Sequence, residues 1–302
     1  MGFFNGHGKG AAILKLDDKK IRGGKAVGLP YVGSKKKVAK KIVEIIKQNF
    51  GTNKTVYDLF GGGGAITAEC VISGLNVVYN DADRLTAESL SLVAKADRDF
   101  IKSLIVDREE FCRIRDSVSK TPLDNLKLIV NSFGNNRRNY LYTKEHSDIK
   151  YELSRLIINK YNLFTNFKQT TEYLNAVEKY GKPLERLLGL ERLNQIERLQ
   201  RVDGLEDIAF NSYDYVDYSD VNGGIIYLDP PYENTTNEYR VNVGNYKAFY
   251  KWCHNMAEKN IVIISGYKMP DSFECVYGFK KARSTYRGGY SGDHEKLFMP
   301  RN

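Results

Sequence analysis

The stretch Ile225–Tyr232, with the sequence IIYLDPPY, says most about how this chain folds. Its first four residues are apolar and rich in β-branched and aromatic side chains, which predicts a short buried β-strand. The two prolines that follow Asp229 cannot continue strand pairing, so the strand should end at the acid. Because open α/β sheets bind ligands at the carboxyl ends of their strands, we expect Asp229 and Tyr232 to face a ligand site.

The end of this predicted strand carries groups suited to chemistry on an exocyclic amine. A flat base can stack on the ring of Tyr232, while its amino group donates hydrogen bonds to the Asp229 carboxylate and the Pro230 carbonyl. An acid followed by two prolines is also compatible with a plain turn in which the acid only caps a neighbouring element. Motifs elsewhere in the chain decide between the two interpretations.

Residues 55–79 predict a strand–loop–helix–strand unit, which is how a parallel sheet begins. A helix capped by Ser34 precedes this unit, and helical periodicity follows it over 85–104. Further strands are expected at 208–210, 224–228 and 261–265, with a helix at 247–258 between the last two. The alternation predicts an α/β fold with a Rossmann-like sheet.

The middle of the chain interrupts this alternation. Residues 98–204 are polar, aromatic and helical in pattern, so we expect an insertion there that splits a catalytic domain into 29–97 and 205–302. Residues 1–28 are rich in Gly and Lys and predict a flexible leader. A Leu-Glu-Arg-Leu repeat at 184–199 places apolar residues at every third position, which does not match the 3.6-residue turn of a helix. We interpret the repeat as a pair of helices that use different faces.

The composition favours a polyanionic partner. The 302 residues carry a formal net charge of +9, which indicates nucleic acid first and an acidic membrane surface second. The four cysteines have irregular spacing, which favours reduced thiols over disulfides or zinc. We expect no metal. No apolar run is long enough to span a bilayer and no signal peptide is evident, so a cytoplasmic location is expected.

The sequence DLFGGGG at Asp58–Gly64 predicts a loop that approaches a ligand closely, because glycines leave room beside the backbone. Its spacing does not fit the G-x-G-x-x-G fingerprint of dinucleotide sites. A nucleoside without a pyrophosphate, such as S-adenosylmethionine, is a better match. Asp81 lies at the end of the next predicted strand, where an acid accepts hydrogen bonds from ribose hydroxyls.

Together these motifs resemble the Dam-like family of DNA adenine N6-methyltransferases, in the order cofactor loop, target-recognition insertion, D-P-P-Y. Phe60–Gly64 matches the family's F-x-G-x-G loop, and Asp229–Tyr232 matches its D-P-P-Y motif. Tyr31–Lys35 fits an upstream motif of an aromatic, two small residues and a lysine, with Tyr31 in place of the usual Trp. Arg22–Lys25 is a rival for this motif, but it lacks the aromatic.

The resemblance implies that S-adenosylmethionine donates a methyl group to the N6 amino group of a flipped-out adenine at a specific site in duplex DNA, leaving S-adenosylhomocysteine. It implies catalytic roles for Asp229, Pro230, Pro231 and Tyr232. It also implies that Ser212 and Tyr213 line the adenine side of the cofactor pocket. The full set of implied cofactor contacts is Tyr31, Lys35, Asp58, Phe60, Gly62, Gly64, Asp81, Ser212, Tyr213 and Asp229.

DNA contacts are expected from the insertion, because Arg reads guanine and Asn reads adenine in the major groove. The residues with this chemistry are Asn135, Asn136, Arg137 and Arg138. They are equally compatible with phosphate anchors or a polar loop. Contacts to phosphates are expected from Lys280, Lys281, Arg283 and Arg287. A monomer is expected, because methylation of one strand per visit needs no two-fold symmetry. The target sequence and a restriction-endonuclease partner stay undetermined.

Related motifs serve other substrates. Methylation of cytosine N4, of RNA adenine or of a protein glutamine amide also acts on an NH₂ group. A non-catalytic DNA-binding protein on the same fold is a further alternative, although an intact Asp229–Tyr232 motif and glycine loop argue against it. The acid at 229, the large insertion and the basic charge favour DNA adenine.

Overall fold

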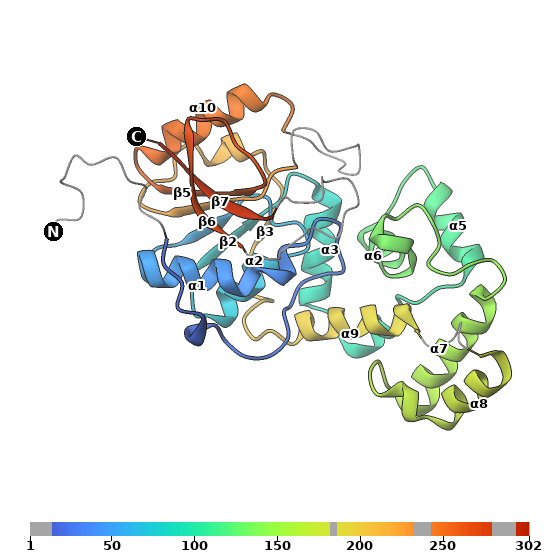
Figure 1. Ribbon diagram of the computed structural model, residues 1–302. Helices are drawn as coiled ribbons and strands as arrows, with labels where there is room; N and C mark the ends of the chain where they lie inside the picture. The colour runs from blue at the N-terminus through green and yellow to red at the C-terminus, as the bar shows by residue number, and fades with distance from the viewer. Residues whose placement is uncertain (1–13, 182–185, 232–242, 280–293, 302) are drawn as a thin grey trace.

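A computed structural model describes residues 14–181, 186–231, 243–279 and 294–301 (Figure 1). In chain order, its helices, 3-10 turns (η) and strands are η1 Asp18–Lys20, η2 Lys35–Lys37, α1 Ala39–Phe50, β1 Val56–Asp58, α2 Ala65–Ile72, β2 Val77–Asn80, α3 Arg84–Ala94, α4 Arg98–Lys102, α5 Arg108–Asp116, α6 Pro122–Asn131, η3 Phe133–Asn135, α7 Ser147–Tyr161, η4 Phe167–Gln169, α8 Thr171–Tyr180, α9 Leu188–Gln200, β3 Phe210–Asn211, η6 Tyr215–Tyr218, β4 Ile225–Leu228, α10 Tyr246–Ala257, β5 Ile261–Gly266, β6 Phe273–Gly278 and β7 Lys296–Pro300.

The strands form one seven-stranded sheet in the order β3-β2-β1-β4-β5-β7-β6. The first five in this order run parallel, and β7 pairs antiparallel with both β5 and β6. Strand order reverses between β1 and β4, where Asp58 pairs in register with Tyr227. This reversal is the switch point at which doubly wound sheets bind their ligands. The α/β fold with a Rossmann-like sheet predicted from the sequence is confirmed.

Helices cover both faces of the sheet, and β4 shows why. Ile225 and Tyr227 pack with α1 and α2 on one face, while Ile226 and Leu228 pack with α10 on the other. All four side chains are buried, so the strand is apolar throughout rather than alternating. The buried strand ends at Asp229, as the two prolines predicted.

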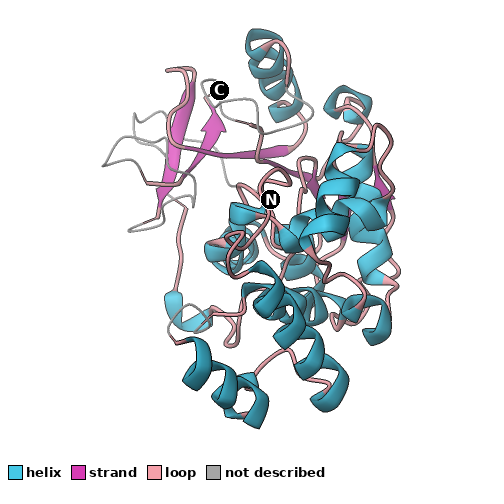
Figure 2. Ribbon diagram, turned by 90° about the vertical axis from the view of Figure 1, so that its right-hand side faces the viewer, coloured by secondary structure: helices cyan, strands magenta, loops and turns pink. Residues whose placement is uncertain are grey.

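Residues 98–181 and 186–204 are mainly helical, as expected, and form a lobe beside the sheet domain (Figure 1). Figure 2 turns this lobe toward the viewer. Helices fill the lower half of the picture, and the strands of the sheet lie in the upper half. The buried core of α3 continues into α6, α7 and α9, so the lobe shares a hydrophobic core with the sheet domain. In the described part of the chain, no helix is long and apolar enough to cross a membrane.

Residues 14–28 pack on the sheet domain, whereas the sequence predicted a flexible leader over 1–28. Leu14 and Val27 are buried, and the Leu14 N–H donates to the Val276 carbonyl at 3.0 Å. Arg22 forms two hydrogen bonds, of 2.5 and 2.6 Å, with the buried Glu69 carboxylate on α2. These contacts come from isolated side chains and one backbone N–H, so they leave no periodic pattern in the sequence.

Two further elements differ from the sequence prediction. Ser34 caps the short turn η2, and α1 begins only at Ala39. The Leu-Glu-Arg-Leu repeat does not form a pair of helices over the residues described: its second and third copies lie in the single helix α9. The apolar residues of these copies spiral around α9, and several neighbouring helices pack against them. All four are therefore fully buried: Leu190, Leu193, Ile196 and Leu199.

Candidate active site

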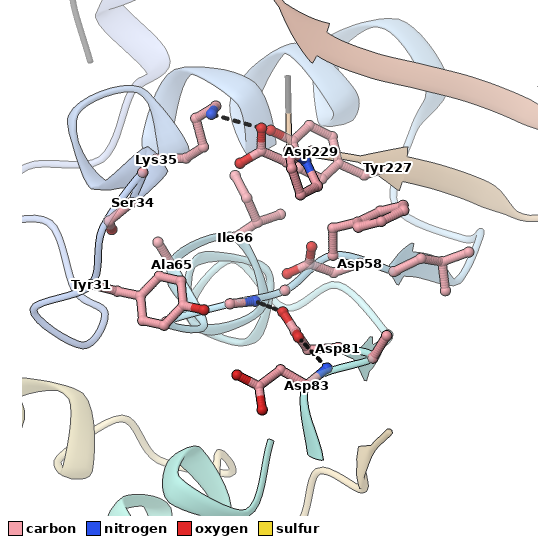
Figure 3. Close-up of a pocket in the computed structure, with 18 of the residues that line it drawn as sticks. Tyr31, Ser34, Lys35, Asp58, Ala65, Ile66, Asp81, Asp83, Tyr227 and Asp229 are labelled. Atoms are coloured by element: carbon pink, nitrogen blue, oxygen red, sulfur yellow. Dashed lines mark hydrogen bonds and ion pairs between the residues drawn. The ribbon is translucent and has the colours of Figure 1, made fainter. Parts of the chain in front are cut away.

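A pocket opens at the carboxyl ends of β1, β2 and β4, beside the switch point of the sheet (Figure 3). The space in it, open mouth included, is about 910 Å³. The lining comes from three parts of the chain: residues 31–35 before α1, the loops after β1 and β2, and the segments around Asp214 and Asp229.

The glycine loop forms the floor of this pocket. Gly62 has a φ of +50°, and a Cβ there would lie 3.1 Å from the Tyr31 ring. Gly64 has a φ of +70°, and a Cβ would lie 2.6 Å from Leu90, so packing within the protein already requires glycine. Gly62 lines the pocket, whereas Gly64 lies behind the lining and begins α2. The cofactor contact expected at Gly64 stays a prediction, and the structure shows that this glycine is also needed for the turn into α2.

Asp58 ends β1 and points into the pocket, with only 1% of its surface exposed. Its Oδ2 accepts hydrogen bonds from the Thr67 N–H at 3.1 Å and the Thr67 hydroxyl at 2.7 Å, at the start of α2. Burial raises the pKa of Asp58 to about 7; the hydrogen bonds from Thr67 oppose this rise, and the Asp229 charge adds to it. A positive ligand would relieve this cost.

Asp81 lies at the end of β2, as predicted, and braces the glycine loop. Its Oδ2 accepts from the Gly62 N–H at 2.8 Å, and its Oδ1 accepts from the Asp83 N–H at 2.9 Å (Figure 3). Burial raises the pKa of Asp81 to about 6, while these two backbone hydrogen bonds oppose the rise. Each carboxylate oxygen retains capacity for a further donor, such as a ribose hydroxyl.

Lys35 lies on η2 and reaches across the pocket to Asp229. Its Nζ lies 2.7 Å from Asp229 Oδ1 and 3.7 Å from the buried Glu295 carboxylate. Tyr31 also lines the pocket, on the glycine-loop side. The alternative motif, Arg22–Lys25, does not line the pocket: Lys25 is exposed, and Arg22 is paired with Glu69. The structure thus brings Tyr31 and Lys35, and not Arg22 and Lys25, to the pocket.

A hydrogen-bonded chain holds the Asp229 carboxylate. The Ser265 hydroxyl on β5 donates to Asp229 Oδ1 at 3.0 Å, and Tyr227 and Ser265 hydroxyls lie 2.9 Å apart. Because the Ser265 proton goes to Asp229, Tyr227 is the donor in the second bond. Burial raises the pKa of Tyr227 well above its usual value, so this donor keeps its proton. Ser265 could not be identified from the sequence, because it belongs to no recognisable motif and lies on the neighbouring strand β5.

The pocket is acidic. Lys35 is the single basic residue of the described lining. Five aspartates line the pocket: Asp58, Asp81, Asp83, Asp214 and Asp229. Such a charge balance suits a cationic ligand with hydroxyl groups and disfavours a pyrophosphate. No group of three or more His, Cys, Asp or Glu side chains that would hold a metal ion occurs among the residues described.

An aromatic wall closes the pocket near β3. The rings of Phe60 and Tyr215 stack with centroids 6.1 Å apart, and Phe249 packs edge-on against both. Asp214 and Tyr215 line the pocket, whereas the predicted Ser212 and Tyr213 lie outside the lining. Strand β3 ends at Asn211, so Ser212 and Tyr213 follow it directly and the two lining residues come next.

The remaining predicted catalytic residues are only partly described. Pro231 lines the pocket and Pro230 is buried beneath it. Tyr232 lies outside the described residues, as do Lys280, Lys281, Arg283 and Arg287.

The predicted DNA-contacting residues form a loop after α6, and they do not all face the same way. Arg138 is exposed, and Asn136 Oδ1 accepts hydrogen bonds from the N–H groups of Arg138 and Asn139. The Asn135 Oδ1 is buried without a hydrogen-bond partner in the described structure. Arg137 is partly buried and lies over Tyr31, at the edge of the pocket.

The sequence was compared with known proteins. A family model described as D12 class N6 adenine-specific DNA methyltransferase matches residues 31–259. The match includes Tyr31, the glycine loop, the whole helical lobe and Asp229. A search of curated proteins found no match.

Proposed function

Because the chain belongs to the D12 class N6 adenine-specific DNA methyltransferases, we propose that its acidic pocket binds S-adenosylmethionine and that Asp229 receives the target adenine. The activity itself, methylation of adenine N6 in DNA, follows from membership of the family. The proposal concerns the donor, its site and the residues that act on the base.

The charge of the pocket is the observation that carries this proposal. Five aspartates against one lysine favour a ligand with positive charge, and S-adenosylmethionine carries both a sulfonium and an ammonium group. Asp81 at the end of β2 is placed to accept ribose hydroxyls. The stacked rings of Phe60 and Tyr215 offer an apolar wall for adenine. We therefore assign Asp214 and Tyr215 to the adenine side of the cofactor site, in place of Ser212 and Tyr213.

The bound cofactor supplies an electrophilic methyl group. The adenine amino group is a poor nucleophile, because its lone pair is delocalised into the ring. Hydrogen bonds from its two N–H groups to the Asp229 carboxylate and the Pro230 carbonyl favour a pyramidal nitrogen with an available lone pair. Asp229 also stabilises the positive charge that develops on the nitrogen. It need not be a strong base, since the proton can leave after transfer.

Ser265 and Lys35 both contact Oδ1 of Asp229, which leaves Oδ2 without a contact in the described chain and available to the base. The adenine must leave the stacked duplex to reach this oxygen. Tyr232 would stack on the flipped base and offset part of the unstacking cost, by about 1–3 kcal/mol. We expect a monomer to suffice, because one molecule methylates one strand per visit.

Calorimetric titration of the DNA-free protein tests the site. We expect S-adenosylmethionine to bind and NAD⁺ not to bind. Asp81→Ala should weaken S-adenosylmethionine binding about tenfold or more, because a hydrogen bond to a charged group is lost. Asp220→Ala is the matched control, since Asp220 is exposed and lies outside the pocket lining.

The same titration has an expected pH dependence. Above a pH of about 6 Asp81 is a carboxylate, and below it the protonated acid loses acceptor capacity. Affinity in the wild type should therefore fall as the pH is lowered through 6. Asp81→Ala should show a smaller fall, centred near 7, because Asp58 in the same pocket still becomes protonated. Equal binding of NAD⁺, or an unchanged affinity in Asp81→Ala, would contradict the assignment of the pocket.

A further inference from the structure

Arg137 belongs to the loop expected to contact DNA, yet its side chain is directed at the pocket. Its Cζ lies 5.7 Å from the centroid of the Tyr31 ring, within the range of a cation–π contact. Its Nη1 donates to Asn125 Oδ1 at 3.3 Å. The guanidinium also opposes the rise in the pKa of both Tyr31 and Asp81, which places its charge near two pocket residues.

The anchor of this guanidinium is rigid. Asn125 is fully buried on α6, and its Nδ2 donates to the Ser89 hydroxyl of α3 at 3.0 Å. Ser89 in turn donates to the Leu85 carbonyl at 2.6 Å. The position of the Arg137 side chain is thus set by two packed helices rather than by solvent.

The backbone of the loop also directs Arg137 inward. Its φ is +63°, a left-handed conformation that is unfavourable for a residue with a Cβ. The Arg137 N–H donates to the Ser132 hydroxyl at 2.9 Å, and Ser132 is buried. Such strained conformations persist where surrounding contacts hold them, often next to functional sites.

Tyr31 is sensitive to small displacements, because it packs tightly on the glycine loop. A Cβ on Gly62 would lie 3.1 Å from Tyr31 Cε1, and one on Gly63 would lie 2.9 Å from Tyr31 Cβ. A shift of the ring would therefore alter the pocket beside both glycines.

We propose that Arg137 is a positioning residue of the cofactor pocket: held by Asn125, its guanidinium fixes the Tyr31 ring as a wall of that pocket. Arg137 then contributes to cofactor affinity through Tyr31, and base reading by the loop falls chiefly to the exposed Arg138. The inference rests on the proposed function, in which this pocket holds S-adenosylmethionine.

The test is a double-mutant cycle on S-adenosylmethionine affinity, measured by calorimetry without DNA. The proteins are wild type, Arg137→Ala, Tyr31→Ala and the double variant. Arg137→Ala should raise the dissociation constant about threefold to tenfold, the effect of losing one partly buried cation–π contact. In the Tyr31→Ala background the same change should have no further effect, because the partner of Arg137 is already gone.

Two variants separate this role from general damage to the loop. Arg137→Gly suits the positive φ and should weaken binding as much as Arg137→Ala. Arg113→Ala removes a guanidinium that is 73% exposed on α5 and should leave cofactor affinity unchanged.

The affinities for cofactor and DNA distinguish a positioning role of Arg137 from a DNA-reading role. Wild-type affinity for Arg137→Ala and Arg137→Gly would overturn the inference, and so would an equal loss with and without the Tyr31 ring. Lowered DNA affinity with unchanged cofactor affinity would likewise return Arg137 to the DNA-reading residues. A wild-type protein that binds no S-adenosylmethionine would overturn the proposed function instead, and with it this inference.

Discussion

At Asp229, one carboxylate oxygen is engaged by the protein and the other faces the pocket. Lys35 and Ser265 both contact Oδ1, at 2.7 and 3.0 Å. Tyr227 donates to Ser265 and fixes the direction of the Ser265 proton. The carboxylate therefore has a defined orientation before substrate arrives, which is the kind of preorganisation that lowers a barrier.

Removal of the Ser265 hydroxyl should affect turnover more than binding. We expect Ser265→Ala to lower kcat about tenfold, the value of one hydrogen bond to a charged group, with little change in the KM for S-adenosylmethionine. Tyr227→Phe should have a smaller effect, since Ser265 still donates directly. Steady-state kinetics check this, with the exposed Ser272→Ala as control. A raised KM at unchanged kcat would assign Ser265 to cofactor binding instead.

Residues at strand ends were the most predictable part of the site. Asp58 is the last residue of β1, and Asp81 and Asp229 directly follow β2 and β4. The sequence therefore places all three at one edge of the sheet, and all three line the pocket. Ser265 could not be predicted, because its importance depends on β5 lying next to β4. Arg137 has chemistry that fits DNA, and its left-handed backbone conformation and its hydrogen bond to Asn125, which direct it toward Tyr31, leave no sequence pattern.

Among the elements, short strands caused the largest errors. Strand β3 covers only Phe210–Asn211, whereas the sequence predicted a strand at 208–210. In the loop that follows, Asp214 and Tyr215 line the pocket, and Ser212 and Tyr213 do not. Strands β6 and β7 were not predicted at all. Their partners are distant in sequence, and β7 inserts antiparallel between β5 and β6, an arrangement that local patterns do not encode.

Helix α9 explains part of the Leu-Glu-Arg-Leu repeat. Its leucines are buried, and Arg192 lies beneath the end of α6 with 8% of its surface exposed. One Arg192 nitrogen, Nη1, donates to three carbonyls, of Ile129, Val130 and Ser132, at 3.3, 2.7 and 2.6 Å. A cation at a helix carboxyl end satisfies carbonyls that lack partners and complements the helix dipole. The repeat thus anchors the loop that carries Arg137.

Loss of this anchor should lower stability. We expect Arg192→Met to reduce the free energy of unfolding by about 2 kcal/mol or more, because buried carbonyls lose their charged donor. Arg186→Met is the control: its pair with Glu191 is exposed, and such pairs contribute about 0–1 kcal/mol. Urea unfolding followed by circular dichroism measures both. Equal, small losses would show that Arg192 does not support α6.

Over the whole molecule, charge is distributed unevenly. The chain carries +9 overall, while its pocket holds five aspartates and one lysine. A net positive charge attracts DNA, and the acidic pocket suits the cationic cofactor and the amino group of the proposed function. The helical lobe and the sheet domain meet at α9, where Lys36 Nζ donates to Gln195 Oε1 at 2.6 Å. Burial, followed by the charges of Arg198 and Arg192, lowers the pKa of Lys36 to about 8.

The most direct test of the account separates chemistry from DNA binding at Asp229. Wild type, Asp229→Ala and the exposed-site control Asp220→Ala are each incubated with unmethylated duplex DNA and S-adenosylmethionine, and the digested nucleosides are identified by mass spectrometry. DNA affinity is measured on the same preparations. The account predicts N6-methyladenine from wild type and Asp220→Ala, a loss of more than about a hundredfold in Asp229→Ala, and retained DNA affinity in that variant. Near-normal N6-methyladenine formation by Asp229→Ala would contradict it.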